Sequence, residues 1–226
     1  MKRSEINSII ENGIAFMNKH QFKLPPFAYF TPKDWAEKSH EYDEIRNNLL
    51  GWDITDFGSG DFHKIGLFLF TLRNGNLKNP SDKKPYAEKI LIVEEGQVTP
   101  YHFHWHKMED IINRGGGNLL VKVYNATEND EFSEDDVEVQ IDGRHYTVPA
   151  GTIIRLSPGE SMTMTTRLYH SFWAEEGCGT ALIGEVSQVN DDSADNRFYE
   201  PTGRFPEIEE DEPAKYLLGN EYPKAK

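Results

Sequence analysis

Residues 99–117 read TPYHFHWHKMEDIINRGGG, and this stretch decides how the rest of the chain is interpreted. Three of the chain's eight histidines alternate at positions 102, 104 and 106, a glutamate follows at 109, and three glycines close the segment. Side chains repeat every two residues in a strand, so His102 and His104 would project from one face and could converge on one metal ion. Glu109 would join them after a tight turn into the neighbouring strand.

A fourth ligand has to come from a distant strand, and His170 in the aromatic segment TTRLYHSFW is the best candidate. Three imidazoles and one carboxylate suit a divalent ion such as Mn²⁺, Fe²⁺, Co²⁺, Ni²⁺ or Zn²⁺. The competing interpretation is a closed, structural zinc site with four protein ligands. The remaining histidines are expected beside the metal without binding it (His106), at the surface (His20, His40, His145), or at the surface or a pocket edge (His63).

The fold class follows from the pattern after about residue 50, where short strand segments such as KILIVEEG and GTIIRLSPGE are separated by glycine turns. The Asp142-Gly143 pair inside VEVQIDGRHYTV predicts a hairpin, and the strand in HKIGLFLFTLRNG is expected to end in a turn at Asn74-Gly75. Strands this short and this regularly spaced predict an all-β domain over residues 51–190, a sandwich or barrel of the jelly-roll kind.

The two ends of the chain differ from this β domain. Residues 1–50 are predicted to form a helical arm, with a helix over 4–19 capped by Ser4 and a short helix over 33–38 that starts at Thr31-Pro32. Residues 191–226 are polar and irregular, but their interspersed aromatic residues predict that this tail packs on the barrel. Its acidic run is expected to be a solvated surface loop: Glu207, Glu209, Glu210, Asp211 and Glu212.

Composition restricts the class of partner. The 226 residues carry a net charge of −14, which disfavours binding to nucleic acid or to an anionic membrane and suits a neutral substrate such as a sugar. No segment approaches the roughly 18 consecutive apolar residues of a membrane span, and the N-terminus lacks a signal-peptide pattern. The single cysteine, Cys178, excludes an intrachain disulfide. We therefore expect a cytoplasmic protein.

The spacing Gly96-x5-His102-x-His104-x4-Glu109-x6-Gly116 resembles the first motif of the cupin superfamily. His170 follows VPAGT and LSPGE, where the second cupin motif supplies its histidine, although the glycine-to-proline spacing is longer than usual and the asparagine that normally follows is absent. The resemblance implies a cupin jelly-roll barrel holding one metal ion inside. Transferred residue by residue, the ligands would be His102, His104, Glu109 and His170.

The wider segments PYAEKILIVEEGQVTPYHFHWHKMEDIINRGGGNLLVKVYN and GEVSQVNDDSADNRF, among others, resemble the D-lyxose isomerases of the cupin superfamily over most of the chain. The resemblance implies a homodimeric, metal-dependent sugar isomerase that usually carries Mn²⁺. It also implies interconversion of D-lyxose with D-xylulose and of D-mannose with D-fructose.

Aldose–ketose isomerisation needs a base that moves a proton between two carbons, and Glu109 would be committed to the metal. We expect Glu185 in TALIGEVSQV to be that base, because it would lie among apolar neighbours that raise the pKa of its carboxyl. Lys107, beside the metal motif, and Lys89, in AEKILIV, could stabilise negative charge on a sugar oxygen. Each of the three could instead be a surface residue, and a metal-assisted hydride shift would not need Glu185.

Substrate contacts are expected after the Glu185 strand, since paired carboxylates and an arginine often bind sugar hydroxyls through directional hydrogen bonds. The candidates in NDDSADNRF are Asp191, Asp192 and Arg197, and a capped turn is the alternative. Trp173, with Trp105 and Phe172, could offer an aromatic wall to the sugar, although core packing would explain at least two of these three.

Three rival functions remain compatible with the sequence. A cupin dioxygenase could use the same four ligands with iron, and a non-catalytic cupin could bind sugar or serve as a storage protein. A metal-free cupin isomerase acting on a sugar phosphate fits less well, because the chain is strongly acidic and offers few arginines for a phosphate.

Overall fold

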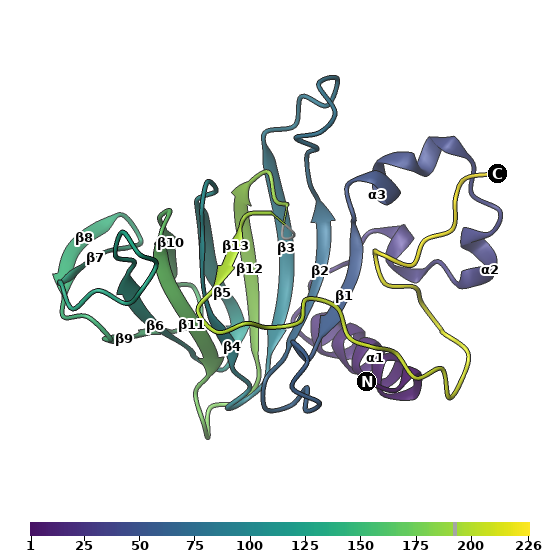
Figure 1. Ribbon diagram of the computed structural model, residues 1–226. Helices are drawn as coiled ribbons and strands as arrows, with labels where there is room; N and C mark the ends of the chain where they lie inside the picture. The colour runs from purple at the N-terminus through teal and green to yellow at the C-terminus, as the bar shows by residue number, and fades with distance from the viewer. Residues whose placement is uncertain (192–193) are drawn as a thin grey trace.

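The computed structural model describes residues 1–191 and 194–226, which form two antiparallel sheets that face each other (Figure 1). Within these residues the large sheet has eight strands, in the order β1-β2-β3-β12-β5-β10-β7-β8, and the small sheet has five, in the order β13-β4-β11-β6-β9. The strands of the large sheet are β1 (Gly51–Thr55), β2 (Leu67–Arg73), β3 (Tyr86–Val93), β5 (Glu109–Gly116), β7 (Val137–Ile141), β8 (Arg144–Val148), β10 (Ser161–Met164) and β12 (Ala181–Gln188). Those of the small sheet are β4 (Thr99–His104), β6 (Leu119–Asn125), β9 (Ile153–Leu156), β11 (Leu168–Ala174) and β13 (Asn196–Phe198).

The predicted all-β jelly-roll barrel is therefore confirmed, and its core lies between the two sheets. Leu69, Leu91 and Ile183 from the large sheet pack in one buried cluster with Val121 and Phe172 from the small sheet. Alternate residues of the same large-sheet strands point the other way, which gives these strands two buried faces. Because the inner face is filled by aliphatic side chains along much of its length, polar groups on that face stand out as candidate site residues.

The outer face of the large sheet is covered by the N-terminal helix α1 (Arg3–Lys19) (Figure 1). Ile6, Ile10 and Met17 of the helix join Phe68 and Ile92 of the sheet in a second buried cluster. The predicted amphipathic helix is thus confirmed, but it begins before Ser4, so the prediction that Ser4 caps it is wrong.

Short helices complete the arm: η1 (Pro26–Tyr29), α2 (Pro32–Trp35), η2 (His40–Tyr42) and α3 (Asp43–Asn47). Thr31 caps α2 by accepting the N–H of Asp34 at 3.2 Å, which confirms the predicted start, but the helix ends at Trp35 and not at residue 38. None of the helices in the described residues has the length and hydrophobicity that a membrane span requires.

Two turns were predicted with different success. The Asp142-Gly143 hairpin is confirmed: both residues have positive φ, 49° and 79°, and they join β7 to β8. β2 does end just before Asn74-Gly75, but the prediction of a turn formed by these two residues is wrong. A long loop, residues 74–85, connects β2 to β3, which starts at Tyr86. That loop borders the site described below.

The C-terminal tail packs on the rest of the molecule, as predicted, with Leu218 only 2% exposed in the cluster beneath α1. The residues of the acidic run are exposed, which confirms the expected surface loop, but some of them also contact α1. Asp211 accepts the backbone N–H of Ser4 at 2.9 Å and its hydroxyl at 2.7 Å, while the buried Arg3 forms ion pairs with Glu210 at 2.6 Å and with Glu221. The acidic run therefore binds the N-terminus of α1.

Candidate active site

The three histidines of the predicted metal site come together inside the barrel. His102 and His104 lie on β4, and His170 lies on the adjacent β11, directly opposite His102 in the strand register. All three are buried, and one ring nitrogen of each lies within 4.8 Å of the others. The alternation expected from the sequence thus places the imidazoles on the inner face.

Each ring is oriented by a hydrogen bond from its Nδ1. His102 Nδ1 donates to the carbonyl of Pro100, His170 Nδ1 to that of Leu168, and His104 Nδ1 to Asn196 Oδ1, all at 2.9 Å. Such contacts fix the tautomer that leaves Nε2 with a free lone pair, the form in which imidazole binds metals.

Glu109, the first residue of β5, brings a carboxylate to the same place. Its Oε1 lies 3.2 Å from His104 Nε2 and 3.6 Å from His170 Nε2. Despite these distances, neither nitrogen makes a hydrogen bond to any residue that the structure describes. Buried acceptors that face one another in this way are satisfied by a cation placed between them, so the residues fit a metal ion.

The protonation states agree with this fit. Burial lowers the pKa of His102 well below its usual value, and the neighbouring His170 and His104 lower it further. Burial also lowers the pKa of His170 to about 4, with Glu109 opposing the shift. Burial opposes ionisation of Glu109, but Lys107, His104 and His170 hold its pKa well below the usual range. Neutral imidazoles and an ionised carboxylate are the forms that ligate a divalent ion.

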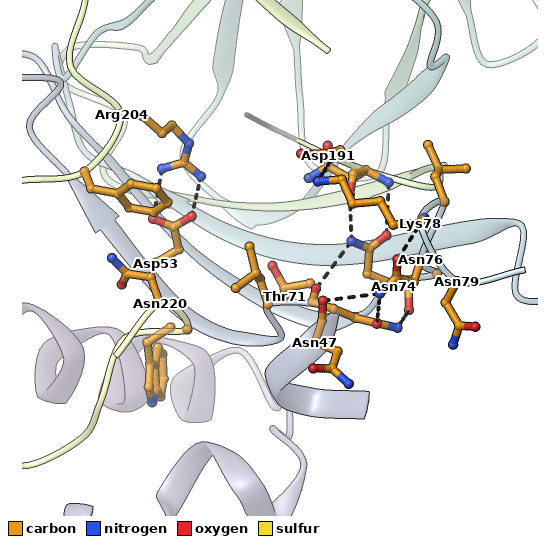
Figure 2. Close-up of a pocket in the computed structure, with 18 residues that line it drawn as sticks. Asn47, Asp53, Thr71, Asn74, Asn76, Lys78, Asn79, Asp191, Arg204 and Asn220 are labelled. Atoms are coloured by element: carbon orange, nitrogen blue, oxygen red, sulfur yellow. Dashed lines mark hydrogen bonds and ion pairs between the residues drawn. The ribbon is translucent and has the colours of Figure 1, made fainter. Parts of the chain in front are cut away.

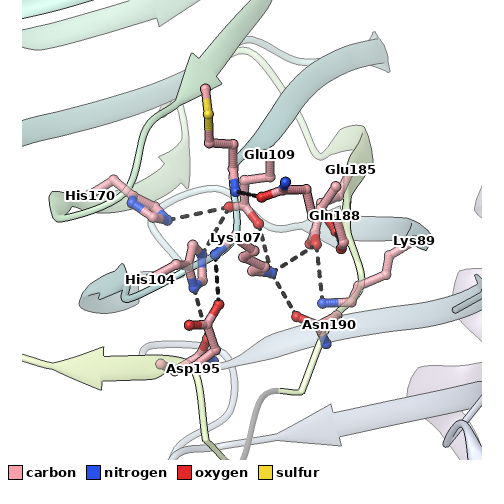
Figure 3. Close-up of polar contacts among 12 residues, drawn as sticks. Lys89, His104, Lys107, Glu109, His170, Glu185, Gln188, Asn190 and Asp195 are labelled. Carbon is pink, nitrogen blue, oxygen red and sulfur yellow. Dashed lines mark hydrogen bonds and ion pairs between the residues drawn. The ribbon is translucent and has the colours of Figure 1, made fainter. Parts of the chain in front are cut away.

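Lys107 lies next to these groups, in the turn between β4 and β5 (Figure 3). The Asp195 carboxylate holds the turn by accepting the backbone N–H groups of His106 at 2.8 Å and Lys107 at 3.1 Å. The side chain of Lys107 is buried, and its Nζ lies 2.8 Å from Glu109 Oε2 and 3.2 Å from Glu185 Oε1. One ammonium group therefore bridges the two predicted carboxylates.

Glu185 and Lys89 face each other across β12 and β3, directly opposed in the strand register. Lys89 Nζ lies 3.1 Å from Glu185 Oε1, and both residues are buried on the inner face of the large sheet. The prediction that Glu185 lies among apolar neighbours is wrong, because the ammonium groups of Lys89 and Lys107 both contact its Oε1.

Asn190 ties this cluster to the loop that follows β2. Its Oδ1 accepts from Lys107 Nζ at 2.7 Å. The Asn74 side chain binds both backbone groups of Asn190, donating to its carbonyl at 2.8 Å and accepting its N–H at 3.0 Å. Asn74 is itself 5% exposed, so this double contact fixes the backbone from which Asn190 reaches Lys107.

Three other predicted residues do not line the cavity around this cluster, which we call the metal cavity. Asp191 Oδ2 forms an ion pair at 2.9 Å with Lys78 of the 74–85 loop. Arg197 lies on β13 and pairs with Phe103 of β4. Its neighbours Asn196 and Phe198 face inward, so the Arg197 side chain points to the outer face of the small sheet. Trp173 likewise alternates with the inward-facing Phe172, so Arg197 and Trp173 point away from this cavity, whereas Asp191 lines the larger cavity described below. Asp192 lies outside the described residues.

The remaining histidines lie apart from the cluster of three. His106 has an exposed side chain and contributes its backbone N–H to the Asp195 contact. His63 is exposed and contacts Glu94 at 2.6 Å, while His40 and His145 are exposed beside acidic residues. His20 packs against Phe16 of α1.

Sequence reasoning missed several residues at the site. Asn196 and Phe198 line the metal cavity from β13, but a strand of three residues inside a polar segment is too short to give a periodic signal. Asn190, Asp195 and Arg204 carried no signal either, because each is brought in by the irregular tail. All three belong to residue types that the chain also uses in ordinary surface turns.

The metal cavity is small. It has a volume of about 40 Å³, with Lys89, Lys107, Glu109 and Glu185 among its polar lining and Phe57, Phe172 and Phe198 among its apolar lining. About 10–15 Å³ of such volume holds one water molecule, so the cavity has room for a few atoms beyond a metal ion.

The comparisons with known proteins agree with this geometry. The family model described as D-lyxose isomerase matches residues 1–222. The chain belongs to the D-lyxose isomerase family. A D-lyxose/D-mannose isomerase of Escherichia coli O157:H7 is 52% identical over 223 residues, and one of Serratia proteamaculans is 51% identical, each match covering 98% of both chains. The chain is thus a sugar isomerase of the aldose–ketose class.

Solved structures with the same fold are more distant in sequence. The L-ribose isomerase of Cellulomonas parahominis with L-ribose has a TM-score of 0.59 at 17% identity, and the match covers 92% of this chain and 98% of that one. The L-ribose isomerase of Acinetobacter sp. DL28 with L-ribose has a TM-score of 0.58 at 14% identity, covering 88% and 93%. At such identities the likeness establishes a common fold.

Proposed function

We propose that the chain interconverts D-lyxose with D-xylulose and D-mannose with D-fructose, using one divalent metal ion, preferably Mn²⁺. The carrying observation is that His102, His104 and Glu109 line one cavity with Glu185 and two lysines, and that a ring nitrogen of His170 lies within 4.8 Å of those of His102 and His104. The curated relatives, 52% and 51% identical, are named D-lyxose/D-mannose isomerases, which supports the choice of sugars.

The ion would be held by His102, His104, Glu109 and His170. When bound, it would supply a Lewis acid that polarises the sugar carbonyl. In the proposed reaction the Glu185 carboxylate takes the proton from C2 of the aldose and returns it to C1, while the hydroxyl proton of O2 passes to O1, so that C2 becomes the carbonyl of the ketose. Lys107 and Lys89 orient Glu185 and stabilise the negative charge that develops on a sugar oxygen.

Activity after metal exchange tests this function. The protein is treated with a chelator, loaded with Mn²⁺, and incubated with D-lyxose or D-mannose while ketose is measured. We expect ketose from both sugars with Mn²⁺ and at least a hundredfold less without it. Bound metal without ketose would contradict the isomerase proposal, and oxygen consumption by the iron-loaded protein would favour a dioxygenase.

Glu185→Gln tests the proposed base. We expect kcat to fall at least a thousandfold with Mn²⁺ still bound, because general-base catalysis contributes about 10²–10⁴-fold and the amide also loses its charge pairing with the lysines. Glu138→Gln is the matched control, since Glu138 lies on β7 with 70% of its side chain exposed. Reaction in D₂O distinguishes the routes: a proton transfer incorporates solvent deuterium into the product, whereas a hydride shift does not.

Two properties implied by the family resemblance stay predictions. A homodimer would give about twice the 26.0 kDa chain mass in light scattering. A cytoplasmic location would place the activity in the soluble fraction of gently lysed cells, separate from periplasmic marker enzymes.

A further inference from the structure

A second and much larger cavity adjoins the metal cavity. Its volume is about 550 Å³, within the range of small-molecule sites, which is roughly 300–1,000 Å³. Asparagines are prominent in its lining, and Asn47, Asn76, Asn79 and Asn220 surround its outer part (Figure 2). Amide side chains offer both donors and acceptors, the combination that neutral hydroxyl groups require.

The two cavities meet at Arg204, which lines both of them. Arg204 comes from the C-terminal tail and pairs with Asp53 of β1, where Nη1 lies 3.1 Å from Asp53 Oδ1 and Nη2 contacts Oδ2. The side chains of Arg204 and Asp53 are 18% and 20% exposed, so solvent screens the ion pair only in part. Figure 2 shows the Arg204 guanidinium pointing toward the Asp53 carboxylate.

A row of polar side chains crosses the same junction on the inner face of the large sheet. Thr71 pairs with Lys89 in the register of β2 and β3, and Lys89 pairs with Glu185 in the register of β3 and β12. Thr71 lines the large cavity, whereas Lys89 and Glu185 line the metal cavity. The row therefore leads from the proposed reaction centre toward the asparagines.

The small volume of the metal cavity limits how much of an open-chain sugar it can hold. A volume of about 40 Å³ accommodates roughly three water-sized groups, so beside a metal ion no more than the reacting C1–C2 end of a sugar fits there. The rest of the chain must extend elsewhere. The paired strands β3 and β12 close the sheet behind Glu185 with an unbroken register from Ala181 to Gln188, so the polar junction at Thr71 and Arg204 offers the compatible direction.

We propose that the junction and the asparagine-lined cavity form the subsite for the non-reacting end of the open-chain sugar, and that this subsite sets the preference between five- and six-carbon substrates. The inference rests on the proposed isomerase function and goes beyond it. The sixth carbon of a hexose reaches furthest along the junction, so contacts with Arg204 and Thr71 contribute more to the reaction of D-mannose than to that of D-lyxose.

Two variants test the proposal by steady-state kinetics with both sugars. In Arg204→Met, the ratio of kcat/KM for D-lyxose to that for D-mannose is expected to rise at least tenfold, the effect of losing a hydrogen bond from a charged donor. In Thr71→Val, which keeps the side-chain shape, the same ratio is expected to rise about threefold to fivefold. Thr163→Val is the matched control, because Thr163 lies on the outer face of the same sheet and contacts Asp110.

A binding measurement gives a readout that does not depend on turnover. D-mannitol and D-arabitol are the reduced forms of the two aldoses, and calorimetric titration of the Mn²⁺-loaded protein measures their affinities. Arg204→Met should lower the affinity for D-mannitol by a factor at least fivefold greater than the factor by which it lowers the affinity for D-arabitol. Thermal melting accompanies each variant, so that a fold defect, which would lower both affinities together, is recognised.

The outcomes separate the two proposals. If the unmodified protein makes no ketose from either sugar, the proposed function fails. If it makes ketose but both variants leave the substrate ratio and the alditol ratio unchanged, the function stands and the subsite is overturned. A shift toward D-lyxose in both variants, with Thr163→Val unchanged, supports the subsite.

Discussion

Asn196 shows how a single contact prepares a ligand, because its Oδ1 fixes the ring of His104 through Nδ1. Removing such a partner commonly reduces metal affinity by about 10- to 100-fold. We expect Asn196→Ala to weaken Mn²⁺ binding by this amount, measured by competition with a fluorescent chelator. Asn125→Ala is the control, since Asn125 lies at the end of β6 and donates to Asp136. Unchanged affinity in Asn196→Ala would show that packing alone orients the ring.

Asn190 acts one step further out, by accepting from the Lys107 ammonium. We expect Asn190→Ala to lower kcat about tenfold with little change in KM, because Lys107 then loses an acceptor while the sugar contacts remain. Asn74→Ala should give a similar but smaller loss, since it releases the backbone of Asn190. A rise in KM with unchanged kcat would contradict this positioning role.

The sequence was most informative about residues whose spacing is imposed by a strand. His102 and His104 alternate on β4, and Lys89 and Glu185 do lie on a buried inner face. It was least informative where chemistry depends on contacts between distant segments. The pairing of Glu185 with two lysines, and the approach of Asn190 and Asn196, arise from strand register and from the path of the tail, neither of which a local pattern encodes.

At the scale of elements, α1 is fixed to the tail by buried charge. Arg3 is 2% exposed and contacts both Glu210 and Glu221. Arg3→Met should lower the free energy of unfolding by roughly 2–3 kcal/mol, a moderate loss because Glu210 is well exposed. For a chain of this size that corresponds to a decrease in Tm of about 5–10 °C. Lys226→Met, which removes an exposed pair with Glu37, is expected to change Tm by less than about 1 °C.

The same contact has a defined pH dependence. The hydrogen bond from Arg3 lowers the pKa of Glu210 below its usual 4.5. A lowered pKa contributes stability that is present above the unfolded value and is lost as the pH falls through the folded value. The difference in Tm between the protein and Arg3→Met should therefore be largest near pH 7 and shrink below about pH 4. A difference that grows in acid would contradict this assignment.

The elements themselves were predictable to different degrees. The amphipathic period of α1 and the Asp142-Gly143 hairpin are local signals, and both predictions were confirmed. The 74–85 loop was predicted wrongly, and the contacts of the acidic run with α1 were not predicted, although the run is exposed as expected. An Asn-Gly pair permits a tight turn without requiring one, and an exposed acidic segment can still pair with a buried cation or a helix N-terminus that the fold places beside it.

For the whole molecule, the metal site should contribute to stability, because it joins β4, β5 and β11 from both sheets. A ligand present at about 100 times its Kd stabilises a fold by roughly 2.7 kcal/mol. We expect chelation to lower Tm by about 5–10 °C and added Mn²⁺ to restore it. The variant His170→Ala, which lacks one proposed ligand, should melt at nearly the same temperature with and without Mn²⁺. Equal melting of the unmodified protein in both conditions would contradict a metal site between the sheets.

The docking of the tail onto α1 also fixes an order of events during synthesis. The backbone donors of Arg3 and Ser4 are satisfied by Glu209 and Asp211, more than two hundred positions later in the chain. Helix α1 therefore gains these partners only after some two hundred further residues have been synthesised. A chain truncated just before Glu209 would keep all the barrel strands in its sequence but would leave these two backbone donors without the acceptors that the tail provides.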